Sequence, residues 1–335
     1  MELIPANPAP EFKEITGWAN SQPLSIKGLK GKVVIIDCWT YTCIFCLRTI
    51  PIMRRLQQKY GKYGLQVVEA HSAEYHFATD HANIKRALSQ YNINDVPVAF
   101  DTNNKTWEAY GNMYWPKHVF IDHNGFVRYE HAGYGGMQDF EDVVVELLQE
   151  AGNKPVEEEE QNDPKDEIYD IYGMQFYGMA PEICVGYSRL RRFGNNQTLK
   201  PEALNVVVAD PGSHDVNVVY LRGRWIWQRE GVQYGAAGGK ERSAAVIMKY
   251  NAAKRVHCIM GTSDGKPGKI EIKLDGNHLT REQLGRHAKL ESEVSIASIE
   301  WSFMHNLVRA DKPETHEIEI IPRSDNIVFY TFVFG

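Results

Sequence analysis

The two cysteines Cys43 and Cys46 are the residues whose type and spacing most directly suggest chemistry. Two residues separate them, an apolar run precedes them, and Pro51 follows five residues after the second. Two thiols at this spacing can form and break a disulfide, and one can attack a foreign disulfide while the other releases the product. Half of a zinc site, a permanent structural disulfide and a pair of unreactive core thiols are the alternatives.

Each alternative is less favoured than redox exchange. A structural zinc site needs four ligands, and the sequence has neither a second cysteine pair at this spacing nor a histidine pair at ligand spacing. A disulfide that closes so short a loop restricts little of the unfolded chain and stabilises weakly. We therefore predict a redox-active Cys43–Cys46 disulfide, no bound metal and no other cofactor.

The elements around the pair are those that such chemistry needs. A β-branched run over 32–38 predicts a buried strand, and the apolar spacing over 47–60 predicts a helix. A thiol at the start of that helix faces unpaired N–H groups and the positive end of the dipole, which favour the thiolate. Cys46 then lies one turn further on the same face. We expect Cys43 to attack and Cys46 to resolve, and Pro51 to kink the helix.

The remaining first half continues the alternation of strands and helices over residues 1–152. Thr79 is the predicted cap of a second helix, and Asn124-Gly125 is a strong hairpin signal. The predicted strands are 65–70, 98–100 and 117–122, and a last helix is predicted over 138–150. This order is that of an α/β thioredoxin-like core.

The second half of the sequence has a different pattern of residues, with an acidic segment followed by short β-rich runs. Residues 153–167 are acidic and flanked by prolines, which predicts a solvated linker, with an acidic docking tail as the alternative. Residues 168–335 contain short β-rich runs, among them 244–248 and 255–260, and turn signals such as Arg222-Gly223 separate them. This pattern predicts an all-β sandwich. Aromatic residues there offer a platform for a sugar ring, although core packing is their more common role. They are Trp225 and Trp227, extended by Tyr220, Tyr234 and Trp301.

The composition excludes some partners. The 335 residues carry a formal net charge of −6, so no basic field attracts nucleic acid or an anionic membrane. No apolar run approaches the roughly 20 residues that span a membrane. The first residues lack the basic and apolar regions of a secretory signal, so the chain as written is expected to be cytoplasmic.

Several segments resemble a known family. Those of the first half are similar to the thioredoxin-like domain of DipZ proteins, within the TlpA/ResA group. They are 39–51, 69–75, 97–101 and 114–117. Segments 180–189, 274–276 and 332–335 resemble the jelly-roll, carbohydrate-binding-module-like β-sandwich that follows that domain. The resemblance implies both folds, a disulfide-exchange activity and a carbohydrate-binding-module-like second domain.

The resemblance also implies further site residues. Pro116 matches the cis-proline that faces the cysteines, and the backbone of Trp115 would pair with a substrate strand. Thr42 and Phe45, which border the cysteines, complete the expected substrate-binding set. Glu74 matches an acid near the cysteines that would shuttle a proton, with an ordinary surface glutamate as the alternative.

Two departures from the family affect the interpretation. DipZ proteins carry a membrane-embedded electron-transfer domain that this sequence lacks, so the extracytoplasmic portion of a longer membrane protein is the alternative localisation. Tyr134 stands within a Gly-Tyr-Gly-Gly segment where the family has Gly-Glu-Gly. Cys38, on the strand before the motif, is expected to be a core residue.

We predict a thiol–disulfide oxidoreductase that reduces protein disulfides with an unidentified electron donor. The β-sandwich would dock a partner or a glycan. One alternative is a binding protein that acts through the sandwich on a redox-inert scaffold, and another is a metal chaperone.

Overall fold

The computed structural model describes residues 3–156, 167–173, 177–197, 200–202, 206–235 and 244–335. The chain forms two compact units, Met1–Ile168 and Tyr169–Gly335. Residues 157–166, most of the predicted linker, lie outside the described residues. Among the described helices, none is both long and apolar enough to span a membrane.

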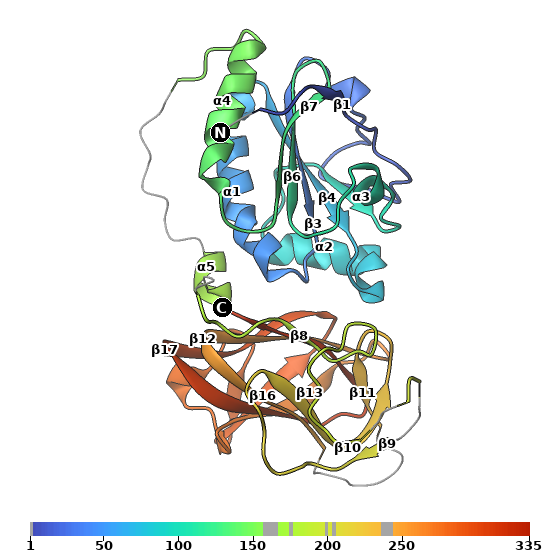
Figure 1. Ribbon diagram of the computed structural model, residues 1–335, viewed down its shortest axis with the longest axis vertical. Helices are drawn as coiled ribbons and strands as arrows, with labels where there is room; N and C mark the ends of the chain where they lie inside the picture. Colours follow the sequence, from blue (N-terminus) through green and yellow to red (C-terminus); the bar gives the residue numbers. More distant parts are fainter. Residues whose placement is uncertain (1–2, 157–166, 174–176, 198–199, 203–205, 236–243) are drawn as a thin grey trace. The chain divides into compact units, whose positions relative to one another are not determined.

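A seven-stranded sheet forms the centre of the first unit (Figure 1). Its strands are β1 (Asn7–Pro8), β2 (Trp18–Ala19), β3 (Val33–Trp39), β4 (Leu65–Ser72), β5 (Val98–Asp101), β6 (Lys117–Ile121) and β7 (Phe126–Ala132). They follow the order β1-β7-β6-β3-β4-β5-β2. Strands β3, β4 and β5 are parallel, whereas β6 and β7 are antiparallel to their neighbours. The predicted hairpin lies between β6 and β7.

Helices cover both faces of this sheet. They are α1 (Ile44–Tyr60), α2 (His81–Gln90), α3 (Lys105–Ala109) and α4 (Phe140–Glu150), with 3₁₀ turns at Lys27–Leu29, Gly61–Tyr63, His76–Thr79 and Met137–Asp139. Figure 1 shows α1 and α4 side by side, and Lys59 and the Tyr60 hydroxyl of α1 both contact Glu141 of α4, at 2.5 and 2.6 Å. The thioredoxin-like fold predicted for this half is confirmed.

Strand β3 is buried along its whole length, as predicted. Because side chains alternate between the faces of a strand, Asp37 and Cys38 point to opposite sides of the sheet. Cys38 packs with Trp107 of α3 in the core of its face, as expected for a core residue. Asp37 therefore lies on the other face.

The cap of α2 differs from the sequence prediction. The N-cap of α2 is Asp80 rather than Thr79, because the Asp80 carboxylate accepts a hydrogen bond from the Ala82 N–H at 2.8 Å. Thr79 closes the preceding 3₁₀ turn instead. Helix α1 includes Pro51 and runs to Tyr60, and the kink expected at Pro51 stays a prediction.

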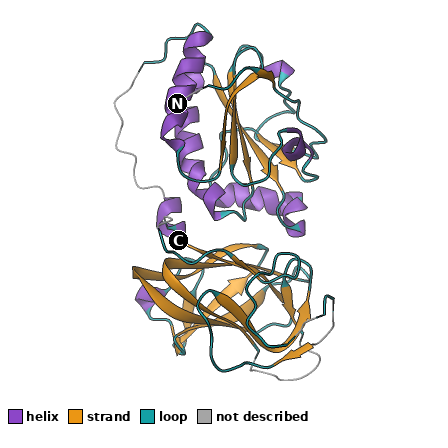
Figure 2. Ribbon diagram, viewed as in Figure 1, coloured by secondary structure: helices purple, strands orange, loops and turns teal. Residues whose placement is uncertain are grey.

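Strands dominate the second unit (Figure 2), which confirms the predicted all-β domain. They are β8 (Ile183–Cys184), β9 (Val206–Val208), β10 (Val218–Trp227), β11 (Val232–Tyr234), β12 (Ala245–Thr262), β13 (Gly268–Leu274), β14 (Asn277–His278), β15 (Lys289–Glu291), β16 (Val294–Ile299), β17 (Phe303–Pro322) and β18 (Ile327–Phe334). The short helix α5 (Glu167–Tyr172) and a 3₁₀ turn at Arg281–Gln283 complete the elements.

The predicted turn at Arg222-Gly223 is wrong, because β10 continues through it. Gly223 has a φ of +94°, a conformation that favours glycine, and this residue is where the strand changes partners. Residues 218–222 pair with β12, 223–225 with β9 and 225–227 with β11. Similarly, the two short runs predicted at 244–248 and 255–260 form the single strand β12, whose register with β17 shifts between the two runs.

The aromatic platform proposed for this unit is largely absent. Trp225 is completely buried in the main core, and Tyr220 and Tyr234 are also buried. Trp227 is half-buried against the same core, where its indole N–H donates to the Val185 carbonyl at 2.9 Å. Trp301 is also half-exposed, so Trp227 and Trp301 are the two members of the proposed set that keep contact with solvent.

Candidate active site

Cys43 and Cys46 occupy different environments at the start of α1. Cys43 is the N-cap, and its Sγ accepts a hydrogen bond from the Cys46 N–H at 3.2 Å. Cys43 is half-exposed, whereas Cys46 is completely buried, and both are free thiols. A ligand in solution therefore meets Cys43 first.

The pairing of β3 with β6 places the predicted site residues at the end of the central strands, where β3 leads into α1. Cys38 pairs with Lys117 of β6, so Pro116 lies just beyond that pair, where β3 leads to the cysteines. The Trp115–Pro116 peptide bond is cis. The Trp115 side chain stacks on Trp107 at 4.2 Å between ring centres, so its ring belongs to the core and its backbone remains the part assigned to substrate.

Two exposed apolar residues come directly before Trp115. Met113 is 75% exposed and Tyr114 is 64% exposed, which is unusual for side chains of this size. The sequence analysis missed them, because a short run of large residues also fits a core segment. They provide apolar surface next to the expected substrate-binding residues.

Thr42 connects Glu74 to the cysteine turn. The Thr42 hydroxyl donates a hydrogen bond of 2.7 Å to the Glu74 carboxylate. Thr42 is buried and Glu74 is half-buried. The structure therefore brings Glu74 to the residue next to Cys43, rather than leaving it isolated on the surface.

Three buried titratable side chains that sequence analysis missed lie side by side in the sheet. Asp37 pairs with Glu69 of β4 and with His118 of β6 in the strand register, and each is at most 2% exposed. Burial raises the pKa of Glu69 well above its ordinary value, so Glu69 keeps its proton and donates to Asp37. Burial lowers the pKa of His118 to about 3, so His118 is neutral.

The same burial affects Asp37 and Cys46. Loss of solvation raises the pKa of Asp37 from 3.8 to about 7, although its hydrogen bond with Glu69 acts in the opposite direction. Burial, together with the neighbouring Cys43 and the charge of Asp37, raises the pKa of Cys46 well above its ordinary value. Cys46 therefore holds its proton at neutral pH, and an acceptor with a pKa near 7 lies within electrostatic range.

Arg48 is a second functional candidate that sequence analysis missed. Its side chain is completely buried although it follows Cys46 by two residues. The guanidinium lies 5.6 Å from the centre of the Phe45 ring and 5.7 Å from that of Tyr134. The signal in the sequence is a basic residue within the otherwise uncharged start of a helix.

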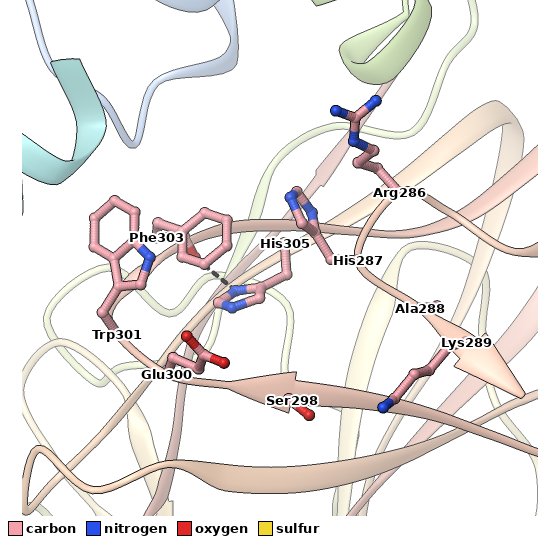
Figure 3. A pocket seen from close by; sticks show the side chains of 9 residues that line it. All are labelled: Arg286, His287, Ala288, Lys289, Ser298, Glu300, Trp301, Phe303 and His305. Carbon is pink, nitrogen blue, oxygen red and sulfur yellow. Dashed lines mark hydrogen bonds between the residues drawn. The ribbon is translucent and has the colours of Figure 1, made fainter. Parts of the chain in front are cut away.

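The second unit has a surface pocket of about 380 Å³ between β15, β16 and the start of β17 (Figure 3). Trp301 stacks on Phe303 at 4.5 Å, and the Nδ1–H of the buried His305 donates to the Phe303 carbonyl at 2.9 Å. Burial lowers the pKa of His305 to about 3, so Nε2 is an acceptor at neutral pH. Arg286, Lys289 and Glu300 supply charged groups to the same pocket. Across the part of the chain that the structure describes, no three His, Cys, Asp or Glu side chains gather as metal ligands.

Two family profiles match the chain in the order of its two units. The first, Redoxin, matches residues 5–145, and the second, described as a thioredoxin like C-terminal domain, matches residues 180–335. Among solved structures, a thioredoxin-like superfamily protein covers 42% of this chain and 96% of its own, with 28% identity and a TM-score of 0.40.

Curated relatives give names to these matches. The protein DipZ of Mycobacterium bovis is 32% identical over 283 residues, which cover 81% of this chain and 38% of DipZ. The chain thus spans less than half the length of that relative. The thiol-disulfide oxidoreductase YkuV of Bacillus subtilis is 27% identical over 143 residues, 43% of this chain and 95% of YkuV. The first unit is therefore similar to thioredoxin-like thiol–disulfide oxidoreductases, and the two units together are similar to part of DipZ.

Proposed function

We propose that this protein reduces disulfides of other proteins through Cys43 and Cys46. The observation that carries the proposal is the asymmetry of the pair, with a half-exposed Cys43 at the helix N-cap and a buried, protonated Cys46 one turn inside. A helix N-terminus stabilises a thiolate, and the exposed thiolate is the nucleophile. The exposed Met113 and Tyr114 supply apolar surface for a protein substrate.

The exchange proceeds in two steps. The Cys43 thiolate attacks one sulfur of the substrate disulfide, a new S–S bond forms, and the other substrate sulfur leaves with the electron pair. Cys46 then transfers its proton to the Asp37–Glu69 carboxyl pair and attacks Cys43, which releases the second substrate thiolate. Glu74, held by Thr42 beside Cys43, relays a proton from solvent water to a leaving thiolate. A dithiol donor must restore the pair with two electrons.

Insulin reduction with dithiothreitol as the donor tests this function. Cys43→Ser is expected to abolish the activity. Cys46→Ser, mixed with insulin in the absence of dithiothreitol, is expected to accumulate mixed disulfides, because the resolving thiol is lost. Cys258→Ser, which changes a buried cysteine of the second unit, is the matched control. Full activity in Cys43→Ser would refute the proposal. Separately, titration of the wild-type Cys43–Cys46 pair against glutathione measures whether its reduction potential is that of a reductant.

The pocket of the second unit supports a docking role toward glycans. Trp301 offers a flat aromatic ring, and flat rings stack against the C–H faces of sugars. The charged groups of Arg286, Lys289 and Glu300 provide donors and acceptors for hydroxyls. The pocket is therefore where glycan docking is best tested.

A glycan array with the full-length protein provides that test. Trp301→Ala is expected to lose any bound glycan, whereas Tyr177→Ala, which removes a fully exposed aromatic side chain outside the pocket, is expected to keep it. Equal binding by both variants would place the docking surface elsewhere.

The competing hypothesis is a binding protein whose thioredoxin-like unit is redox-inert. Capture of protein partners separates the two hypotheses. The exchange enzyme loses captured partners on Cys43→Ser, because they are held by a disulfide. An adaptor that acts through the second unit keeps them.

A further inference from the structure

The buried guanidinium of Arg48 lies under an aromatic cover next to the cysteines. The rings of Phe45 and Tyr134 stack on each other at 6.0 Å, and each lies within 6 Å of the guanidinium carbon. Arginine is almost never fully buried in a protein core without such contacts. Phe45 and Tyr134 are themselves half-exposed, so they form the layer between Arg48 and solvent.

The glycine-rich loop before α4 positions the Tyr134 ring beside Phe45 and Arg48. Gly133, Gly135 and Gly136 have φ values of +90°, +102° and +68°, which other residues rarely adopt. The tyrosine between them is carried onto Phe45 and Arg48 of α1. The contact thus joins two segments that are distant in sequence. It depends on the loop conformation that the glycines allow.

The charge of Arg48 persists in this environment. Burial lowers its pKa to about 10, and the nearby Tyr134 and Cys43 act against that decrease. Arg48 is therefore protonated at neutral pH, and Cys43 lies within electrostatic range of it. A positive charge in a water-poor site acts more strongly on a neighbouring thiolate than the same charge in water.

We propose that Arg48 is a positioning residue that stabilises the Cys43 thiolate, and that Phe45 and Tyr134 hold its guanidinium in place and exclude water from it. The inference rests on the proposed role of Cys43 as the attacking thiol. The charge of Arg48 favours the Cys43 thiolate over both the Cys43 thiol and the uncharged mixed disulfide. It therefore sets how much nucleophile exists at neutral pH and how readily the dithiol is oxidised.

The rate of Cys43 alkylation by iodoacetamide, followed against pH with peptide mass analysis, tests the proposal. Removing a nearby opposite charge is expected to move the midpoint upward by about one pH unit in Arg48→Met. Nucleophilicity falls as a thiol becomes more acidic, so the plateau rate at high pH is expected to rise about threefold in the same variant. Unfolding would also raise both the midpoint and the plateau, so the circular dichroism spectrum of Arg48→Met must match that of the wild type.

Three further variants control the experiment. Arg48→Lys keeps the charge and is expected to retain most of the wild-type profile. Arg55→Met removes a charge from the exposed face of the same helix and is expected to leave the profile unchanged. If Arg48→Met fails to fold, Tyr134→Ala is expected to move the midpoint upward by admitting water, and Tyr134→Phe is expected to keep it.

The equilibrium with glutathione gives a second measurement. Loss of the charge is expected to shift Arg48→Met about tenfold toward the disulfide, which is about 30 mV. A wild-type midpoint and potential in Arg48→Met would overturn this inference and leave the proposed function intact. Preferential alkylation of Cys46 instead of Cys43 would overturn the proposed function itself.

Discussion

At the scale of single residues, the buried carboxyl pair of Asp37 and Glu69 has an energetic cost. The two residues face each other across two parallel strands, and each is at most 2% exposed. A buried carboxyl group stays protonated to a higher pH than an exposed one. The pair therefore stores a proton at neutral pH, at a cost to stability.

The pH dependence of unfolding is expected to show that cost. The pKa of Asp37 rises from 3.8 to about 7, so between these values the folded state binds more protons than the unfolded state. Stability then falls as the pH increases through this window. Asp37→Asn cannot ionise, so it is expected to gain stability over the wild type, from almost none at pH 4 to at most about 4 kcal/mol at pH 8.

Denaturant titrations at several pH values measure this difference. Asp142→Asn, on the exposed face of α4, is the matched control and is expected to show no such trend. Parallel curves for the wild type and Asp37→Asn would mean that Asp37 is not a buried acid.

Glu74 gives a separate prediction for the chemistry. If the carboxylate beside Cys43 transfers a proton, Glu74→Gln is expected to slow insulin reduction at least about tenfold, a modest share of typical acid–base effects. Thr42→Val, which removes only the hydrogen bond of 2.7 Å, is expected to slow it less. Wild-type rates in both variants would return Glu74 to an ordinary surface role.

The sequence predicted some of these residues and not others, for physical reasons. Cys43 and Cys46 were found because their spacing alone implies redox chemistry. Asp37 and Glu69 were missed because each is one polar residue at the end of an apolar strand, and only the strand register makes them neighbours. Arg48 was missed because its aromatic cover includes Tyr134, which is distant in the sequence.

At the scale of elements, β10 depends on a glycine that allows one strand to serve three partners. A methyl group at Gly223 would lie 2.7 Å from Ala244, and the φ of +94° would strain any other residue. Gly223→Ala is expected to destabilise the second unit by roughly 2 kcal/mol or more.

Gly212→Ala is the matched control for this prediction. Gly212 also has a positive φ, but open space surrounds its added methyl group. The variant is therefore expected to lose only the stability that backbone strain costs, about 1 kcal/mol. Denaturant unfolding measures both changes, and insulin reduction is expected to stay at the wild-type rate. Equal losses for the two variants would show that the close approach to Ala244 is unimportant.

The elements of the first unit were predicted better than those of the second. Buried β-branched runs and amphipathic helices have distinct periodicities, so β3, α1 and α4 were found nearly at their true bounds. In the second unit, β10 continues through a glycine with a positive φ and β12 continues through shifts in its register with β17, and both places resemble turns in sequence. Such irregularities and turns use the same residues, so only the pairing of the strands distinguishes them.

At the scale of the molecule, the two units have separate cores. Trp107 packs in a core of the first unit, whereas Trp225 packs in the main core of the second. Cys43 and Cys46 both lie in the first unit. Oxidation is therefore expected to shift only one of two unfolding transitions, because the disulfide changes the stability of one core. Tryptophan fluorescence in denaturant, with and without dithiothreitol, measures this, and a single transition that shifts as a whole would contradict it.

The central sheet of the first unit ends on both sides in a strand of only two residues, β1 and β2. Long strands with unpaired backbone groups recruit other chains, and a short strand that includes a proline is a poor template. β1 ends with Pro8, and β2 covers the fully buried strand β5. Residues 7–19 thus disfavour edge-to-edge aggregation of the sheet. A shortened protein without this segment is expected to be less soluble.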